Sequence, residues 1–152
     1  IAYYMAARHP ERVQSLIAIG NGGFVDAAGA KDYTPEALLA RGETDFIGKM
    51  KALHADAHQS DWKEYMRQEV LDWCSHPALT QEEWKRVTMP MLLIAGEQDM
   101  FASSENLEKI RKCCPQAQIM IAKGCGHRPH FPHERVRDVN EWMLGFLGKN
   151  GG

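Results

Sequence analysis

Short apolar runs alternate with helical patterns along most of this chain. Residues 13–19, 91–95 and 118–122 are apolar with little polar alternation, as in strands that are covered on both faces. Between and after these runs, apolar side chains return every three or four residues, which predicts helices. Because strand and helix alternate, we expect an α/β fold with a parallel sheet and right-handed crossover connections.

Helical patterns open and close the chain. Residues 1–9 predict a buried helix that ends before Pro10, because proline disfavours helical geometry in the residue before it. A further helix is expected to start at Ser104. The last helix has a long apolar face, formed by Val136, Val139, Met143, Phe146 and Leu147. Residues 149–152 then follow as a polar, glycine-rich tail that we expect to be flexible.

The stretch from residue 24 to residue 87 contains helical patterns and no strand pattern. Thr34 followed by proline is typical of a helix start, and Thr80 with Glu83 forms a capping-box pattern. Between these two starts, Ser60 is the predicted cap of a helix with a largely aromatic face, made by Trp62, Tyr65, Met66, Val70 and Trp73.

This helical stretch divides the predicted core into two parts. We expect residues 1–23 and 88–148 to form the sheet and its covering helices, and residues 24–87 to form a helical insertion between them. A chain of 152 residues is long enough for one ordinary domain with a sizeable core.

The bulk composition excludes some partners. The chain is 44% hydrophobic and 25% charged, and its formal net charge is −2, which gives no electrostatic reason to bind nucleic acid. No apolar run approaches the ~20 residues that a membrane span needs. The four cysteines, Cys74, Cys113, Cys114 and Cys125, show no C-x-x-C spacing, and we interpret them as reduced thiols of a cytoplasmic protein.

The candidate chemistry lies where two of the predicted strands end. Asp99 follows the run at 91–95 after a glycine, and His127 follows the run at 118–122 in the same way. An imidazole has an ordinary pKa near 6.5, so it can accept and return a proton near neutral pH. A carboxylate beside it would hold one tautomer and stabilise the protonated ring. We therefore predict that Asp99 and His127 act together as acid and base.

Other interpretations of these residues stay open on the sequence alone. Asp99 could cap a turn at the end of its strand, His127 could be an ordinary loop histidine, and Glu97 is the fallback acid. His127, His130 and His133 are spaced three apart, but the prolines between them disfavour convergence on a metal, so no metal site is predicted.

The strand ends resemble those of a known family. Gly96-Glu-Gln-Asp99, Gly124-Cys-Gly-His127 and the opening residues 4–13, in this order, are similar to the carboxy-terminal half of the α/β-hydrolase fold family. The stretch 24–87 resembles the small helical cap of its esterase branches. The resemblance implies that Asp99 is the triad acid and His127 the triad base, in the family's order of acid before histidine.

The same resemblance places the nucleophile elsewhere. The chain contains no G-x-S-x-G, and it opens at Ile1 inside a helical pattern, so we expect the nucleophile and the oxyanion hole to lie upstream of Ile1. A serine there would imply an esterase-like hydrolase, and an aspartate a dehalogenase or an epoxide hydrolase. A residue without a nucleophilic group would imply a non-catalytic receptor or scaffold.

The resemblance also bears on ligands and partners. No cofactor is implied, and the apolar, aromatic side chains of residues 24–87 suggest a small, mostly apolar substrate. Asn21, Phe24 and Met100 are candidate pocket residues near the strand ends. The first strand has no predicted neighbour on one side, which favours self-association through an exposed sheet edge. We expect these 152 residues by themselves to be inactive.

Overall fold

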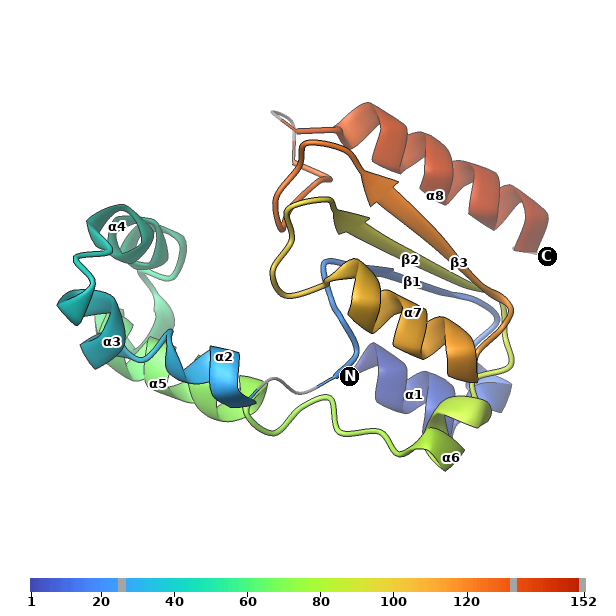
Figure 1. Ribbon diagram of the computed structural model, residues 1–152, viewed down its shortest axis with the longest axis horizontal. Helices are drawn as coiled ribbons and strands as arrows, with labels where there is room; N and C mark the ends of the chain where they lie inside the picture. Colours follow the sequence, from blue (N-terminus) through green and yellow to red (C-terminus); the bar gives the residue numbers. More distant parts are fainter. Residues whose placement is uncertain (25–26, 132–133, 151–152) are drawn as a thin grey trace. The chain divides into compact units, whose positions relative to one another are not determined.

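Figure 1 shows the computed structural model of the protein, which describes residues 1–24, 27–131 and 134–150. By its internal contacts the chain divides into two compact units. The first unit consists of Ile1–Phe24 and Leu79–Gly152, and the second consists of Val25–Ala78.

The first unit contains a three-stranded parallel sheet in the order β1-β2-β3. The strands are β1 (Leu16–Ile19), β2 (Met91–Gly96) and β3 (Ala117–Ala122). Every residue of the central strand β2 is buried, as expected for a strand with neighbours on both sides and helices on both faces. The predicted α/β fold with parallel strands is therefore confirmed.

Helices cover both faces of this sheet. The helices of the first unit are α1 (Ala2–Arg8), the 3₁₀ turn η1 (Pro10–Arg12), α6 (Gln81–Lys85), α7 (Ser104–Cys113) and α8 (Val136–Asn150). In Figure 1, α8 lies on one face of the sheet, and α1 and α7 lie on the other.

Alternate residues of β2 supply the two layers of the core. Leu92 and Ile94 pack with Val139 and Phe146 of α8. On the opposite face, the larger cluster contains side chains of β1, β2, α1, α6 and α7, among them Tyr3, Leu16, Trp84, Leu93, Leu107 and Ile110. Because successive side chains of a strand point to opposite faces, one apolar run is sufficient to build both layers.

The second unit is a small helical cluster. Its elements are α2 (Ala27–Lys31), α3 (Pro35–Ala40), α4 (Thr44–Leu53), the 3₁₀ turn η2 (Ala57–Ser60) and α5 (Trp62–Trp73). Leu38, Ile47 and Met66 form its buried centre, and several half-buried aromatic side chains pack around them. Thr34 caps α3 as predicted, since its hydroxyl accepts a hydrogen bond from the Ala37 N–H at 3.3 Å.

The cap of α5 differs from the prediction. Asp61, and not Ser60, precedes the helix, and its Oδ1 accepts hydrogen bonds from the N–H groups of Lys63 and Glu64 at 3.0 and 3.2 Å. Ser60 has a φ of +66° and donates its hydroxyl to the carbonyl of Ala55 instead. A carboxylate next to the positive end of a helix is at least as good a cap as serine, and the two neighbouring candidates could not be ranked from sequence.

Two other predicted boundaries differ slightly from those in the structure. The capping box of Thr80 and Glu83 is present as predicted, but the helix that it starts, α6, belongs to the first unit by its contacts. Helix α7 starts at Ser104 as predicted, and Ser103 caps it. Helix α8 continues to Asn150, into the stretch that we expected to be a flexible tail, and residues 151–152 lie outside the described residues.

None of the helices in the described part of the chain is both long enough and apolar enough to cross a membrane.

Candidate active site

Asp99 lies in the turn that directly follows β2. Its backbone N–H donates to the carbonyl of Gly96 at 3.1 Å, which closes the turn. Its side chain is fully buried, and Oδ1 accepts hydrogen bonds from the N–H groups of Phe101 and Ala102 at 2.9 and 3.1 Å. The carboxylate is thus oriented by the backbone of its own loop before any other side chain contributes.

His127 lies beyond the end of β3 and meets this carboxylate. Its Nδ1 is 3.2 Å from both Oδ1 and Oδ2 of Asp99. A carboxylate can only accept, so we assign the proton to Nδ1, which leaves Nε2 with its lone pair. The ring of Phe101 packs edge-on against the imidazole, with ring centroids 4.9 Å apart. The side chain of His127 keeps 43% of its surface exposed, so it is accessible to a reactant.

The surroundings of Asp99 favour its charged form. Burial alone would raise the pKa of this carboxyl, but hydrogen bonds from His127 and from the backbone N–H of Phe101 outweigh it, and the pKa lies below its ordinary value. The carboxylate is therefore ionised at neutral pH, as a partner for a protonated imidazole must be.

Backbone contacts between the two strand ends fix the loop that carries His127. Gln98 donates its backbone N–H to the carbonyl of Cys125 at 2.9 Å. The Oε2 atom of Glu97 accepts from the N–H of Gly124 at 3.0 Å. Glu97 therefore holds the histidine loop, and the acid that meets His127 is Asp99.

Two glycines make room for this arrangement. A Cβ atom on Gly96 would collide with the carbonyl oxygens of Cys125 and Gly126. A Cβ atom on Gly20 would stand 2.8 Å from the carbonyl oxygen of His127 and 3.0 Å from its ring, and Gly20 also has a φ of +68°. The strand ends can approach the histidine only because these positions lack a side chain.

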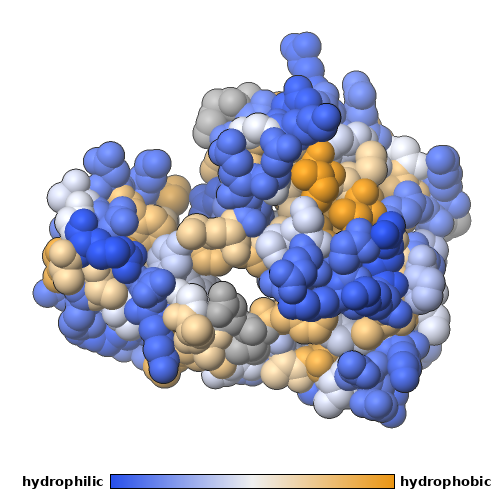
Figure 2. Space-filling view, viewed as in Figure 1, coloured by the Kyte–Doolittle hydropathy of each residue, from blue (hydrophilic) through white to orange (hydrophobic). Residues whose placement is uncertain are grey.

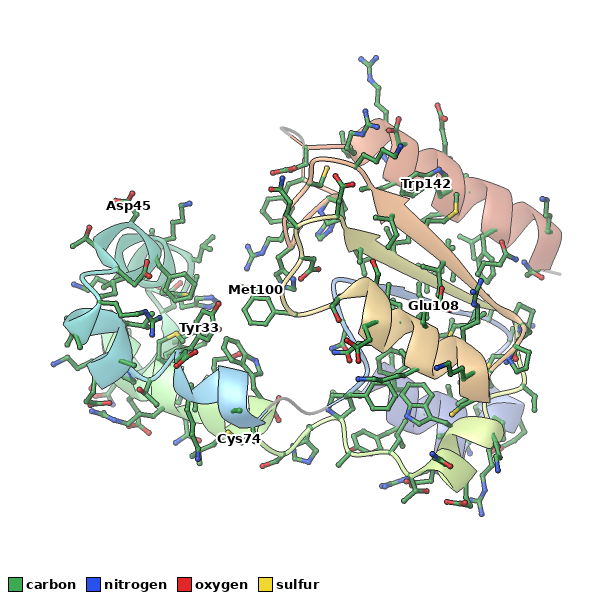
Figure 3. The ribbon with its side chains drawn as sticks, in the orientation of Figure 1. Tyr33, Asp45, Cys74, Met100, Glu108 and Trp142 are labelled. Carbon is green, nitrogen blue, oxygen red and sulfur yellow. The ribbon has the colours of Figure 1, made fainter. Side chains whose placement is uncertain are left out.

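The three predicted pocket residues have contacts of different kinds. The Oδ1 atom of Asn21 accepts from the N–H of Gly23 at 2.9 Å, so this side chain stabilises its own turn. Phe24 packs on Trp84 with ring centroids 5.9 Å apart. Met100 is 69% exposed on the loop between β2 and α7 (Figure 3). Their roles in substrate binding stay predictions.

Sequence reasoning missed Phe101 and Gly20 as parts of the site, and it included Gly96 only as part of the strand-end motif. The only signal for Phe101 was its place two residues after the acid, where an Asx-type turn brings its backbone N–H back to the carboxylate. The close approach of each glycine to the other strand end depends on the register of the sheet, which no local pattern encodes.

Two further polar side chains lie near the histidine along the chain. The pKa of His130 is lowered by burial and by nearby Arg128 and His127, so the ring stays neutral at neutral pH. Burial and nearby Glu134 raise the pKa of Cys125, which disfavours a nucleophilic thiolate. Within the described residues, no three His, Cys, Asp or Glu side chains group as metal ligands would, and His133 lies outside them.

Comparisons with curated proteins find two esterases. They are pimeloyl-[acyl-carrier protein] methyl ester esterases from serogroup C and serogroup A strains of Neisseria meningitidis, and each is 22% identical to this chain. The matches cover 88% and 95% of this chain but only 60% and 54% of the relatives, so the chain spans little more than half of their length. No protein-family model matches the chain.

Solved structures agree on the fold. A serine hydrolase involved in carbazole degradation superposes with a TM-score of 0.66 at 19% identity, over 96% of this chain and 58% of that one. The enol-lactonase from Burkholderia xenovorans superposes with a TM-score of 0.65 at 16% identity, over 97% and 61%. The chain therefore has the fold of the α/β hydrolases, as its strand-end motifs predicted.

The lowered pKa of Asp99 predicts a pH-dependent stability. A carboxyl whose pKa is lower in the folded state stabilises that state above its ordinary pKa of about 3.9, and this contribution is lost as the pH falls through the folded-state pKa. Urea unfolding of the Asp99→Asn variant should therefore show a weaker loss of stability between about pH 6 and pH 3 than the unsubstituted chain. An unchanged pH dependence in the variant would contradict this assignment.

The glycine at the end of β2 leads to a second prediction about stability. Gly96→Ala should lower the free energy of unfolding by about 2 kcal/mol or more, because the methyl group displaces the backbone at Cys125 and Gly126. Gly126→Ala is the matched control, since a Cβ atom there meets nothing within 4 Å and should change stability by less than about 0.5 kcal/mol. Equal losses in the two variants, measured by urea unfolding, would show that the close approach is unimportant.

Proposed function

We propose that this chain supplies the acid and the base of a serine-type hydrolase that cleaves an ester or a related carbonyl compound. The observation that carries the proposal is the contact of His127 Nδ1 with a buried, ionised Asp99 at 3.2 Å. Similarity to proteins named as esterases and as an enol-lactonase supports this reaction class.

The pair has a defined role in such a reaction. The Nε2 atom of His127 removes a proton from the nucleophile hydroxyl as the hydroxyl oxygen attacks the carbonyl carbon of the substrate. The same nitrogen then returns the proton to the leaving alcohol, and an acyl-enzyme remains. In the second half of the reaction, His127 activates water in the same way, and the acid product leaves. Asp99 stabilises the imidazolium in both halves while it stays ionised.

The nucleophile of this proposal lies outside the 152 residues, since their sequence contains no G-x-S-x-G. No cofactor takes part in the steps above. The substrate class that we propose is small and mostly apolar, because the helical unit is rich in aromatic side chains.

The same proposal includes the behaviour of the isolated chain. In the described sheet, β1 and β3 each pair on one side only, so backbone groups along both edges can pair with another chain. We propose that the 152 residues alone hydrolyse no ester and self-associate through this sheet.

Ester hydrolysis tests the role of the pair. In a polypeptide that joins these residues to the sequence encoded upstream, we expect hydrolysis of p-nitrophenyl butyrate. His127→Ala and Asp99→Asn should each lower kcat by about 10³-fold or more. His9→Ala is the matched control, because His9 is exposed at the end of α1, and this variant should retain activity within about twofold.

Two outcomes would contradict the proposal. Unchanged turnover in the His127→Ala variant would show that His127 is not the base. His127-dependent turnover by the isolated 152-residue chain would disprove the proposal that the nucleophile lies outside these residues. Absence of turnover in the joined polypeptide would favour a non-catalytic protein of the same fold.

A further inference from the structure

A second pocket lies in the first unit, at the end of α7 that is farther from Asp99. It encloses about 220 Å³, and its lining includes Phe24, Leu79, Trp84, Lys112 and Cys113. The part of α7 that lines the pocket runs from Lys109 to Cys113, whereas Asp99 lies in the loop before Ser104. Neither Asp99 nor His127 is part of the pocket wall, and Phe24, a predicted substrate contact, is part of it.

The wall of this pocket is built by side chains at helical spacing. Lys109, Lys112 and Cys113 come from one face of α7, and Trp84 comes from α6, which packs beside it (Figure 1). Phe24, Leu79 and Gln81 complete the wall. Phe24 and Leu79 are the first-unit residues at which the chain passes to and from Val25–Ala78. Most of the wall is apolar, whereas the outer surface of α7 is strongly hydrophilic (Figure 2).

One buried polar atom in this wall lacks a partner. Trp84 is only 1% exposed, and its indole Nε1 makes no hydrogen bond with any of the described residues. The six-membered ring of this indole lies against the turn before Phe24, because a Cβ atom on Gly23 would stand 3.1 Å from its Cζ2 atom. A buried donor without a hydrogen bond destabilises the folded protein by about 1–3 kcal/mol. A ligand that accepts a hydrogen bond from this N–H therefore gains more binding free energy than it would from an exposed donor.

The two lysines of the pocket differ in their ion pairs. Lys109 is 3.0 Å from Oε1 of Glu105 and also donates to the side chain of Asn106. Lys112 forms no ion pair with any carboxylate of the described residues. Lys112 contributes to the lowered pKa of Glu105 but is not paired with it, so its ammonium group is available to a ligand of the pocket that it lines.

We propose that this pocket binds a small carboxylate with an apolar body, such as a short-chain fatty acid. The volume corresponds to roughly seven water molecules at about 30 Å³ each, which matches a short acyl chain. The apolar chain packs against Phe24 and Leu79, and the carboxylate pairs with the ammonium of Lys112. One carboxylate oxygen accepts the indole N–H of Trp84. That N–H is shielded from solvent, so side chains of the wall must move as the ligand enters.

Nuclear magnetic resonance of the indole N–H groups tests this proposal directly. The chain has four tryptophans, and Trp84→Phe assigns the resonance of Trp84. Titration with octanoate should shift the Trp84 resonance downfield in a saturable manner, because its N–H gains an acceptor. The neutral analogue 1-octanol should bind at least fivefold more weakly than octanoate.

Two lysine variants supply the matched comparison. Lys112→Met should raise the Kd for octanoate at least fivefold, whereas Lys85→Met, on α6 and outside the pocket wall, should leave it within twofold. His127→Ala should not change octanoate binding, so this result is independent of the proposed hydrolytic function. A Trp84 resonance that does not respond to octanoate, or equal affinity in the Lys112→Met variant, would overturn the proposal.

Discussion

The carboxylate of Asp99 is the interaction on which the arrangement of both strand ends depends. It is fully buried and accepts two backbone N–H groups from its own loop and the Nδ1–H of His127 from the neighbouring strand end. A buried charge is costly unless its hydrogen bonds are satisfied, so the loop after β2 and the loop after β3 must keep their positions together. The same hydrogen bonds that stabilise the charge also orient the histidine.

The parallel sheet explains why these two residues meet. Neighbouring parallel strands end at the same edge of a sheet, and β2 and β3 are paired in register up to Gly96 and Ala122. Residues that follow the two strands by a similar number of positions therefore come together. This is the general location of ligand sites in open α/β sheets, beyond the carboxyl ends of the strands.

The sequence was sufficient to predict the parts of this arrangement that have a local signal. The apolar runs, the cap at Thr34 and the capping box of Thr80 all carry their information within a few residues, and the structure contains each of them. The choice of Asp61 over Ser60 was missed, because both are good caps at adjacent positions. The grouping of α6 with the first unit was missed because it depends on Trp84 packing against Tyr3, a contact distant in sequence.

The central claim is that Asp99 fixes the tautomer of His127, so that Nε2 is the base. Nitrogen-15 NMR of the imidazole at about pH 8, where an ordinary histidine is neutral, measures this directly. We expect a protonated Nδ1 and an unprotonated Nε2 in the unsubstituted chain, and loss of this preference in Asp99→Ala. A predominant Nε2–H tautomer in the unsubstituted chain would contradict it.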